Sequence, residues 1–333
     1  TQVGADLLAN SKVRFVATST IGFDHIDIDF LQQNNIGFAS APGSNANSAA
    51  EYVIAGLLET AQKYDINLEG KSIGIIGVGN VGSRVAKKCT ALGMQTHLND
   101  PPLQRQTGDR KYLPLQELYD CDFITFHTPL TFEGIDKTYH LADEKLLKSL
   151  KEKCVLINAS RGGVVDGKAL KAVIQTGRLK AVVLDVWENE PNINTELLKM
   201  VDIATPHIAG YSLDGKIAGM IMIYKAACEY FGIEPKHDIE DFLPEPAITQ
   251  LKIEPNANNQ QDSLLGAVRE IYDIRKDDVQ LRQILEKPQE QRSEYFDSLR
   301  KNYAVRREFQ NTQIILESPC KSIADKLTGI GFK

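Results

Sequence analysis

Short apolar runs alternate with amphipathic stretches along the first two thirds of the chain. Runs rich in β-branched residues predict buried strands at 13–19, 71–79, 94–100, 122–130, 153–160, 181–187 and 201–207. Apolar residues spaced three and four apart predict helices at 50–62, 81–93 and 168–177. Continuous apolar strands that alternate with helices are typical of a parallel sheet covered on both faces. The pattern therefore predicts a doubly wound α/β domain.

The pattern changes after about residue 210. One long helix is predicted at 214–232, and a segment with three prolines at 235–246 is typical of a linker. Further strands are predicted at 248–253 and 312–318, and further helices at 263–275 and 293–309. We therefore expect a separate, small α+β domain at this end of the chain.

A glycine-rich loop joins the strand predicted at 71–79 to the helix that follows it. Gly77, Gly79 and Gly82 have the spacing G-x-G-x-x-G. The first glycine permits a tight turn, the second lets the backbone approach a pyrophosphate, and the third lets the helix pack closely on the sheet. Free amides at the helix start can bind phosphate oxygens. Because a strand precedes this loop and a helix follows it, the loop is a candidate dinucleotide site.

Asp100 ends the next predicted strand, 23 residues after Gly77. A carboxylate at this point can accept hydrogen bonds from the ribose hydroxyls of NAD and would repel the 2′-phosphate of NADP. The cofactor predicted from these residues is NAD. The alternative interpretation is a tight strand–helix turn that binds no nucleotide.

Three residues with complementary chemistry follow three different predicted strands. Arg161 follows the strand at 153–160, Glu190 follows the strand at 181–187 by a short turn, and His207 closes the last strand. Strands of a parallel sheet end at one edge, so these side chains should converge beside the cofactor. His207 can accept a hydroxyl proton while hydride leaves carbon, and Glu190 can orient its ring. The guanidinium of Arg161 suits a carboxylate or a developing carbonyl oxygen.

Each of these three residues also has a purely structural interpretation. A histidine near a strand end is commonly a satisfied structural residue. An arginine in that position is commonly part of a surface ion pair, and a glutamate before a proline can cap a turn. Their shared edge beside a dinucleotide loop favours oxidation of a 2-hydroxy acid.

Composition limits the possible partners of the chain. It has 333 residues, enough for two or three domains, and a formal net charge of −6. We expect no nucleic-acid or membrane partner, because the charge is acidic and no apolar run approaches the roughly 18 residues that span a bilayer. Five scattered cysteines without a C-x-x-C pair favour reduced thiols and a cytoplasmic location. The chain begins without methionine and without a signal-peptide pattern.

Several sequence blocks resemble those of a known enzyme family. The blocks INASRGGVVD at 157–166, LDVWENEP at 184–191 and TPHIAG at 205–210 are similar to signatures of the D-isomer-specific 2-hydroxyacid dehydrogenases. The blocks at 100–102, 126–141, 207–216 and 299–308 narrow the resemblance to one branch of that family. This resemblance implies an NAD-dependent dehydrogenase that acts on a small phosphorylated 2-hydroxy acid.

The resemblance also implies roles for individual residues. Arg161 and Glu190 would be catalytic, and His207 would accept and donate the proton. Contacts with NAD are implied for Asn80, Val81, Asp100, Thr128, Ala159, Ser160, Asp185 and Gly210, in addition to the loop glycines. Thr20 and Tyr211 would lie near the substrate. The amides around Gly22 are further candidates, because a glycine turn exposes its N–H groups.

The family pattern implies how the chain is divided. We expect a Rossmann domain at 48–209, inserted in a smaller flavodoxin-like substrate domain formed by 1–47 and 210–234. A C-terminal domain at 235–333 would hold a homodimer together. Family members carry roughly another half-hundred residues before the point where this chain begins, within the usual size of such a domain. Part of the substrate domain is therefore expected to be missing.

Two charged clusters need separate interpretation. Asp24, His25, Asp27 and Asp29 have a spacing that suits turn or helix-start acids better than a metal site, so no metal is predicted. A solvated helix face is the first interpretation of the cations Arg300, Lys301, Arg306 and Arg307. The alternative hypothesis is that this basic cluster reaches a partner's active site and attracts a phosphorylated substrate.

Two other functions remain open for this sequence. One is a different enzyme of the same class, such as a D-3-phosphoglycerate dehydrogenase. The other is a corepressor-like binding protein that keeps the fold and uses NAD as a conformational ligand. A turnover assay distinguishes the binding protein from an enzyme, because a binding protein would bind NADH and barely turn over substrate.

Overall fold

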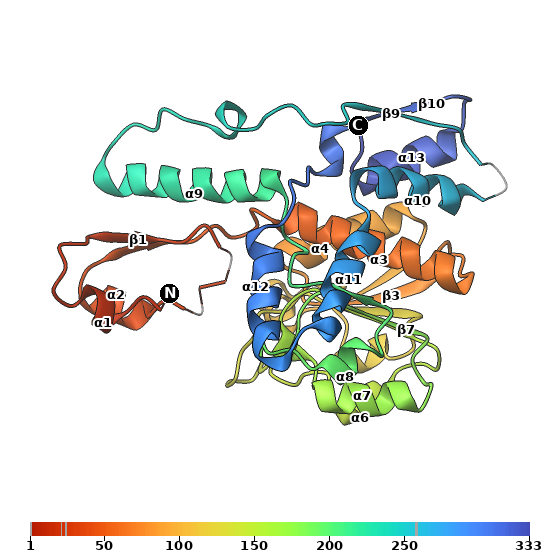
Figure 1. Ribbon diagram of the computed structural model, residues 1–333, viewed down its shortest axis with the longest axis horizontal. Coiled ribbons are helices and arrows are strands. Elements are labelled where there is room, and N and C mark those ends of the chain that lie inside the picture. The colour runs from red at the N-terminus through yellow and green to blue at the C-terminus, as the bar shows by residue number, and fades with distance from the viewer. Residues whose placement is uncertain (1, 21, 24, 257–258) are drawn as a thin grey trace.

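The computed structural model describes residues 2–20, 22–23, 25–256 and 259–333 of the chain. Of the residues discussed above, Asp24 lies outside this described part. Figure 1 shows a central sheet with helices above and below it, and a smaller unit at the N-terminal end of the chain to one side.

The central sheet has six parallel strands in the order β4-β3-β5-β6-β7-β8. In chain order the strands are β3 (Ser72–Ile76), β4 (Gln95–Asn99), β5 (Phe123–Phe126), β6 (Val155–Asn158), β7 (Ala181–Leu184) and β8 (Ile203–Ala204). All six strands end at the same edge. The doubly wound sheet predicted from the apolar runs is confirmed.

Both faces of the sheet are covered, because successive side chains of a strand point to opposite faces. Val155 and Ile157 of β6 join one core, and Leu156 between them joins the other. The helices α3 (Ala46–Tyr64) and α4 (Asn80–Ala91) cover the first face. The second face is covered by α6 (Glu144–Ser149), α7 (Gly167–Gln175) and α8 (Thr195–Leu198), while α5 (Pro101–Thr107) follows β4.

A smaller unit contains the first part of the chain. Its elements are α1 (Ala5–Leu8), β1 (Phe15–Ala17), α2 (Ile28–Gln33) and β2 (Gly37–Ala39), with α9 (Leu213–Phe231) packed on the two strands. The strands β1 and β2 pair in parallel. The chain enters the central sheet through α3 and leaves it through α9, as Figure 1 shows.

The C-terminal segment packs on the helices that cover the sheet. It contains α10 (Gln260–Ile271), α11 (Ile274–Arg282), α12 (Arg292–Lys301), α13 (Lys321–Ile330) and the parallel pair β9 (Gln250–Ile253) and β10 (Gln313–Leu316). The helix expected at 263–275 is two helices, because the chain turns at Tyr272 and Asp273 caps the second one. The three-domain division of the chain stays a prediction.

The helix expected at 293–309 ends at Lys301. The chain then runs without regular structure to residue 308. Arg306 and Glu308 are only 5% and 3% exposed. Side chains two residues apart lie on opposite sides of a helix but on the same side of an extended chain, so leaving the helix lets both side chains reach buried partners.

Apolar helices long enough to cross a lipid bilayer were not found among the described residues.

Candidate active site

The glycine loop has the geometry that its spacing predicts. Gly77 has a φ of +85°, and a Cβ there would lie 2.8 Å from the backbone of His127 and Thr128. A Cβ on Gly82 would lie 1.9 Å from the carbonyl oxygen of Gly77, so only glycine lets α4 begin this close to β3. A Cβ on Gly79 would meet no protein atom within 4 Å. The loop therefore leaves open space at its second glycine, where a pyrophosphate would approach.

Asp100 follows β4 and contacts the glycine loop. One carboxylate oxygen, Oδ2, accepts a 2.7 Å hydrogen bond from the backbone N–H of Val78, and Oδ1 accepts one of 3.0 Å from Leu103. The second bond caps α5. Each oxygen retains capacity for a further donor such as a ribose hydroxyl.

Polar atoms without protein partners lie beside the glycine loop. Thr128 Oγ1 and His127 Nδ1 are buried and have no hydrogen-bond partner among the described residues. Burial lowers the pKa of His127 to about 3, and its Nε2 lies 3.0 Å from Thr125 Oγ1. Buried polar atoms are normally satisfied, so these two suit the polar edge of a bound dinucleotide. The open glycine, the Asp100 carboxylate and these atoms fit NAD.

The other residues expected to contact NAD lie at the same edge or next to it. The side chain of Asn80 lies against Gly43, before α3, and Val81 follows it in the first turn of α4. Ala159 and Ser160 follow β6, where Ser160 Oγ donates to Asn158 Oδ1. Their contacts with NAD stay predictions.

Asp185 has a structural role that the sequence did not show. Its carboxylate is buried, and it accepts hydrogen bonds from the backbone N–H groups of Ile208 and Ala209 and from Thr205 Oγ1. The backbone N–H of His207 donates to the Asp185 carbonyl at 2.7 Å. Asp185 therefore holds the loop that follows β8.

His207 is held in an uncommon backbone conformation. Its φ is +59°, in the left-handed region, where a non-glycine residue costs on the order of 1–3 kcal/mol. The hydrogen bonds that this loop donates to Asp185 offset that cost. Nδ1 of His207 lies 2.7 Å from Oε2 of Glu190, whose other oxygen accepts the backbone N–H of Trp187 at 2.7 Å. The structure thus brings together two residues that are 17 positions apart.

Arg161 lies at the start of the turn that follows β6. In this structure its guanidinium donates to the carbonyl oxygen of Ser160 at 2.8 Å. The turn touches the one that carries Glu190, because a Cβ on Gly162 would lie 1.9 Å from the carbonyl oxygen of Trp187. The loops of Arg161 and Glu190 are therefore in backbone contact, as expected for one shared edge.

The residues expected near the substrate lie in two places. Thr20 is exposed and donates to the carbonyl oxygen of Gly22 at 2.8 Å, in the smaller unit. Tyr211 follows Gly210 at the start of α9, and a Cβ on Gly210 would lie 2.0 Å from Asn45 Nδ2. These residues flank the two chain crossings between the smaller unit and the sheet. Their contact with substrate stays a prediction.

The basic cluster near the C-terminus is not a single solvated face, so our first interpretation of it was wrong. Arg306 is buried, stacks 4.1 Å from the ring centroid of Tyr272 and donates to the Ala209 carbonyl at 2.7 Å. Arg307 pairs with the buried Asp214 at 3.0 Å, and Lys301 is exposed. The cluster is divided because Arg300 and Lys301 lie in the last turn of α12, whereas Arg306 and Arg307 lie beyond its end.

Arg300 is the member of the basic cluster that lies closest to the expected substrate side. Its guanidinium carbon is 6.0 Å from the ring centroid of Tyr211, in the same chain. Within the described part of the chain, the Nε atom of Arg300 is buried and has no hydrogen-bond partner. Lys216 Nζ lies 4.6 Å from the same ring. Two cations therefore flank Tyr211.

Sequence reasoning missed the hydrogen bonds that hold Thr205, two residues before His207. Tyr52 OH lies 2.7 Å from Thr205 Oγ1, and Trp187 Nε1 donates to the Thr205 carbonyl at 3.0 Å. These bonds join α3, β8 and the Glu190 turn. A buried tyrosine in an apolar helix was the one available signal, and its partner could not be read from the chain.

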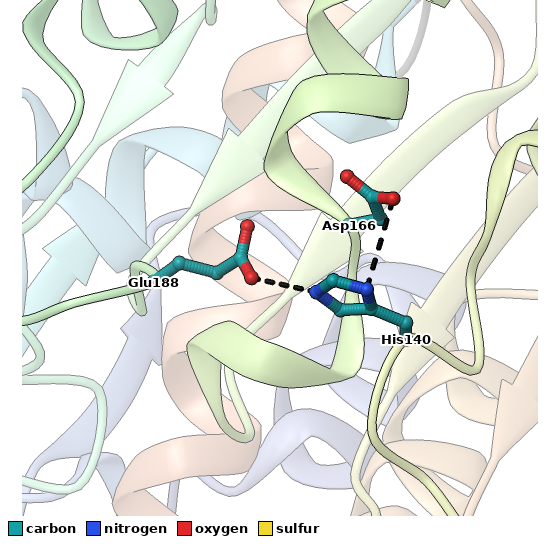
Figure 2. Close-up of side chains that lie close together, drawn as sticks. All are labelled: His140, Asp166 and Glu188. Carbon is teal, nitrogen blue, oxygen red and sulfur yellow. Dashed lines mark hydrogen bonds and ion pairs between the residues drawn. The ribbon is translucent and has the colours of Figure 1, made fainter.

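A second missed group surrounds His140, as Figure 2 shows. Its ring lies between the carboxylates of Asp166 and Glu188. Among the described residues this is the group whose ligand atoms lie close enough to hold a cation, within 4.8 Å of one another. That no metal is needed stays a prediction.

Comparison with known proteins agrees with this geometry. The family described as D-isomer specific 2-hydroxyacid dehydrogenase, NAD binding domain, matches residues 42–209, and a domain of unknown function matches 242–331. The erythronate-4-phosphate dehydrogenase of Marinobacter nauticus is 45% identical, with 100% of this chain and 87% of that protein aligned. The Proteus mirabilis enzyme of the same name is 43% identical, covering 100% of this chain and 86% of its own length.

Solved structures show the same relationship. NAD-dependent formate dehydrogenase from Staphylococcus aureus, in complex with NAD, matches with a TM-score of 0.57 and 26% identity over 68% of this chain and 74% of its own. D-Lactate dehydrogenase from Aquifex aeolicus, complexed with NAD and lactic acid, matches with a TM-score of 0.57 and 27% identity over 69% and 80%.

The narrower resemblance of the blocks at 100–102, 126–141, 207–216 and 299–308 is to 4-phosphoerythronate dehydrogenase, and it is confirmed by these relatives. The prediction of an NAD-dependent dehydrogenase is also confirmed. The chain therefore belongs to the D-isomer-specific 2-hydroxyacid dehydrogenase family.

Proposed function

We propose that the protein oxidises C2 of 4-phospho-D-erythronate with NAD and forms (R)-3-hydroxy-2-oxo-4-phosphooxybutanoate, a step toward pyridoxal 5′-phosphate. The full-length similarity to erythronate-4-phosphate dehydrogenases supports this substrate. The observation that carries the chemistry is the 2.7 Å pair of His207 and Glu190 at the strand edge that also holds the glycine loop.

The pair defines how a proton can move. Nδ1 of His207 carries the hydrogen that the Glu190 carboxylate accepts, which leaves the lone pair on Nε2 for the substrate hydroxyl proton. When bound, NAD supplies the acceptor for the hydride that leaves C2. The hydroxyl oxygen then becomes the carbonyl oxygen, and the proton remains on Nε2 of His207. Glu190 stabilises the resulting imidazolium, because its negative charge is adjacent to it.

Arg161 would bind the carboxylate of the substrate beside the reacting carbon. Its present bond to the Ser160 carbonyl uses one guanidinium nitrogen, and the fork has further donors for a two-oxygen partner. This arrangement orients C2 and stabilises charge on its oxygen during the reaction.

The phosphate of the substrate would lie toward Tyr211. Arg300 and Lys216 flank that ring, and Arg300 has a buried donor without a partner. Thr20 and the amides around Gly22 are the proposed contacts from the smaller unit. In this proposal, Arg300 binds the phosphate of a substrate in the active site of its own chain.

The function is tested by a panel of 2-hydroxy acids with NAD, followed by NADH absorbance. We expect 4-phospho-D-erythronate to have the largest kcat/KM, and the same acid without phosphate to lose at least about tenfold, because the phosphate binds charged donors. Activity on D-3-phosphoglycerate or another acid, without activity on 4-phospho-D-erythronate, would overturn the substrate. NADH binding without turnover on any acid would favour a binding protein.

We also propose that the protein is a cytoplasmic homodimer. All five cysteines are free thiols, which supports a reducing compartment. Large apolar side chains are exposed along α9 and the chain after it, at Met220, Tyr230, Phe231, Ile233 and Phe242, which supports association. Light scattering on the purified protein tests this, and a monomer at micromolar concentration would contradict it.

A further inference from the structure

Three loops that leave the carboxyl edge of the sheet are joined by polar side chains (Figure 2). Nε2 of His140, in the loop after β5, lies 2.7 Å from Oε1 of Glu188 in the turn after β7. Nδ1 of His140 lies 3.7 Å from Oδ2 of Asp166 in the turn after β6. The backbone N–H of His140 also donates to the carbonyl of Gly163 at 2.8 Å.

Glu188 is the member that joins the two turns bearing the proposed catalytic residues. Its second oxygen, Oε2, accepts the backbone N–H of Gly167 at 2.7 Å, at the first residue of α7. A Cβ on Gly167 would lie 2.8 Å from this oxygen, so the glycine permits the close approach. Asp166 meanwhile caps α7 through the N–H groups of Lys168 and Ala169. Glu188 is thereby fixed to the start of a helix.

The Arg161 turn (residues 161–167) therefore meets the Glu190 turn (residues 187–190) at both of its ends. At the first end, the backbone at Gly162 lies directly against the Trp187 carbonyl. At the second end, Glu188 binds the N–H of Gly167. A change at either end would shift one turn relative to the other. It would thereby shift the Arg161 guanidinium relative to the His207 imidazole.

One side of Glu188 faces open space. Glu188 borders a cavity of about 350 Å³ that is also lined by Lys168, Trp187 and Asn192. A turn that faces a cavity has few neighbouring atoms to restore its position once a polar contact is lost. At the Gly167 end, the separation of the two turns therefore depends on the hydrogen bonds of Glu188.

The geometry of His140, Asp166 and Glu188 favours direct polar contacts between the side chains over a bound cation. The two nitrogens of His140 point in different directions, each toward its own carboxylate, as Figure 2 shows. Oε2 of Glu188 and Oδ1 of Asp166 already accept backbone N–H groups. A metal would need these ligand atoms to converge on one point.

We propose that Glu188 is a positioning residue for the reaction: bound to Gly167 and His140, it sets where Arg161 lies relative to the Glu190–His207 pair. It touches neither substrate nor cofactor in this role and acts through the Arg161 turn. Because the role rests on the proposed function, its experiment includes Arg161 itself.

The test compares Glu188→Ala, Glu188→Gln, Arg161→Lys and the double variant Glu188→Ala/Arg161→Lys in full kinetics with 4-phospho-D-erythronate. Activity is expressed per NADH-binding site, so that unfolded protein does not count. We expect Glu188→Ala to lower kcat/KM by about tenfold, mainly through KM, because a small displacement of Arg161 weakens its proposed contact with the substrate carboxylate. Glu188→Gln should retain activity within about threefold, since an amide can satisfy both partners.

The control is Glu196→Ala, which removes an exposed glutamate of α8 and should leave the kinetics unchanged. If Glu188 acts through Arg161, the two losses are not additive in the double variant. Additive losses, or a normal kcat/KM per NADH site in Glu188→Ala, would overturn the proposal. If Arg161→Lys itself leaves kcat/KM unchanged, the proposed function fails first, and the positioning role fails with it.

Discussion

The cofactor loop and the catalytic edge lie at the same end of one sheet, yet they are built in opposite ways. The loop at 77–82 lies within a single strand–turn–helix unit, and its geometry depends on glycines, which have no side chain. The edge that carries Arg161, Glu190 and His207 is assembled from three turns, and its geometry depends on polar contacts between them.

This difference shows which part of the site tolerates change. Adding one carbon at Gly82 or Gly77 produces contacts with backbone at 1.9 Å or 2.8 Å, which no rotamer can relieve. Removing one bond at the edge leaves the fold intact and alters only the relative placement of two side chains. We therefore expect mutations of the loop to affect stability and cofactor binding, and mutations of the edge to affect rate.

The largest expected effect is at the edge. Replacing His207 with Asn removes the proposed proton acceptor, so kcat should fall by about 10²–10⁴-fold, the usual contribution of a general base. The affinity for NADH should stay within about threefold, because the glycine loop is untouched. Stopped-flow turnover and NADH titration measure the two quantities. His237→Asn, an exposed histidine in the linker, is the control, and equal losses in both variants would contradict the comparison.

The next effect separates two glycines of the same loop. Gly82→Ala should lower the free energy of unfolding by about 1–3 kcal/mol, because its Cβ would overlap the Gly77 carbonyl. Gly79→Ala should keep the free energy of unfolding of the parent, because its Cβ meets no atom of the described residues within 4 Å. It should nevertheless weaken NADH binding by about tenfold or more. Urea unfolding and NADH titration test both. A Gly79→Ala protein that binds NADH normally would remove the loop from the cofactor site.

The last expected effect is a pH dependence of stability that comes from His127. Burial lowers its pKa in the folded protein to about 3, so between about pH 6.5 and pH 3 the unfolded chain binds a proton that the folded chain does not. Its contribution to stability is complete above pH 6.5 and declines as the pH falls. In His127→Gln the loss of unfolding free energy between pH 7.5 and pH 5 should be smaller by about 2 kcal/mol.

Urea unfolding at the two pH values measures this difference. His237→Gln is the control, because it makes the same replacement at a largely exposed side chain. An unchanged pH slope in His127→Gln would mean that its ring is solvated in the folded protein, and that the cofactor side of the site is more open than the structure shows.

Sequence reasoning was sufficient wherever the signal is local. The apolar runs of the strands, the glycine spacing at 77–82 and the carboxylate at Asp100 each lie within about thirty residues. The convergence of Glu190 with His207 was also predictable, because parallel strands end at a common edge. Helix ends were less predictable, since the stop at Lys301 depends on buried partners of Arg306 that lie elsewhere in the chain.

The amino-acid sequence by itself determined the sheet, the glycine loop and the choice of side chains that we propose to react, because apolar runs, turn glycines and residue chemistry need no distant partner. Only the tertiary structure decided what holds those side chains in place. Asp185 binding the His207 loop, Tyr52 bonding to Thr205 and Glu188 reaching Gly167 are contacts between residues 21 to 153 positions apart. A buried polar group must find a partner, but nothing in its neighbouring sequence specifies which one.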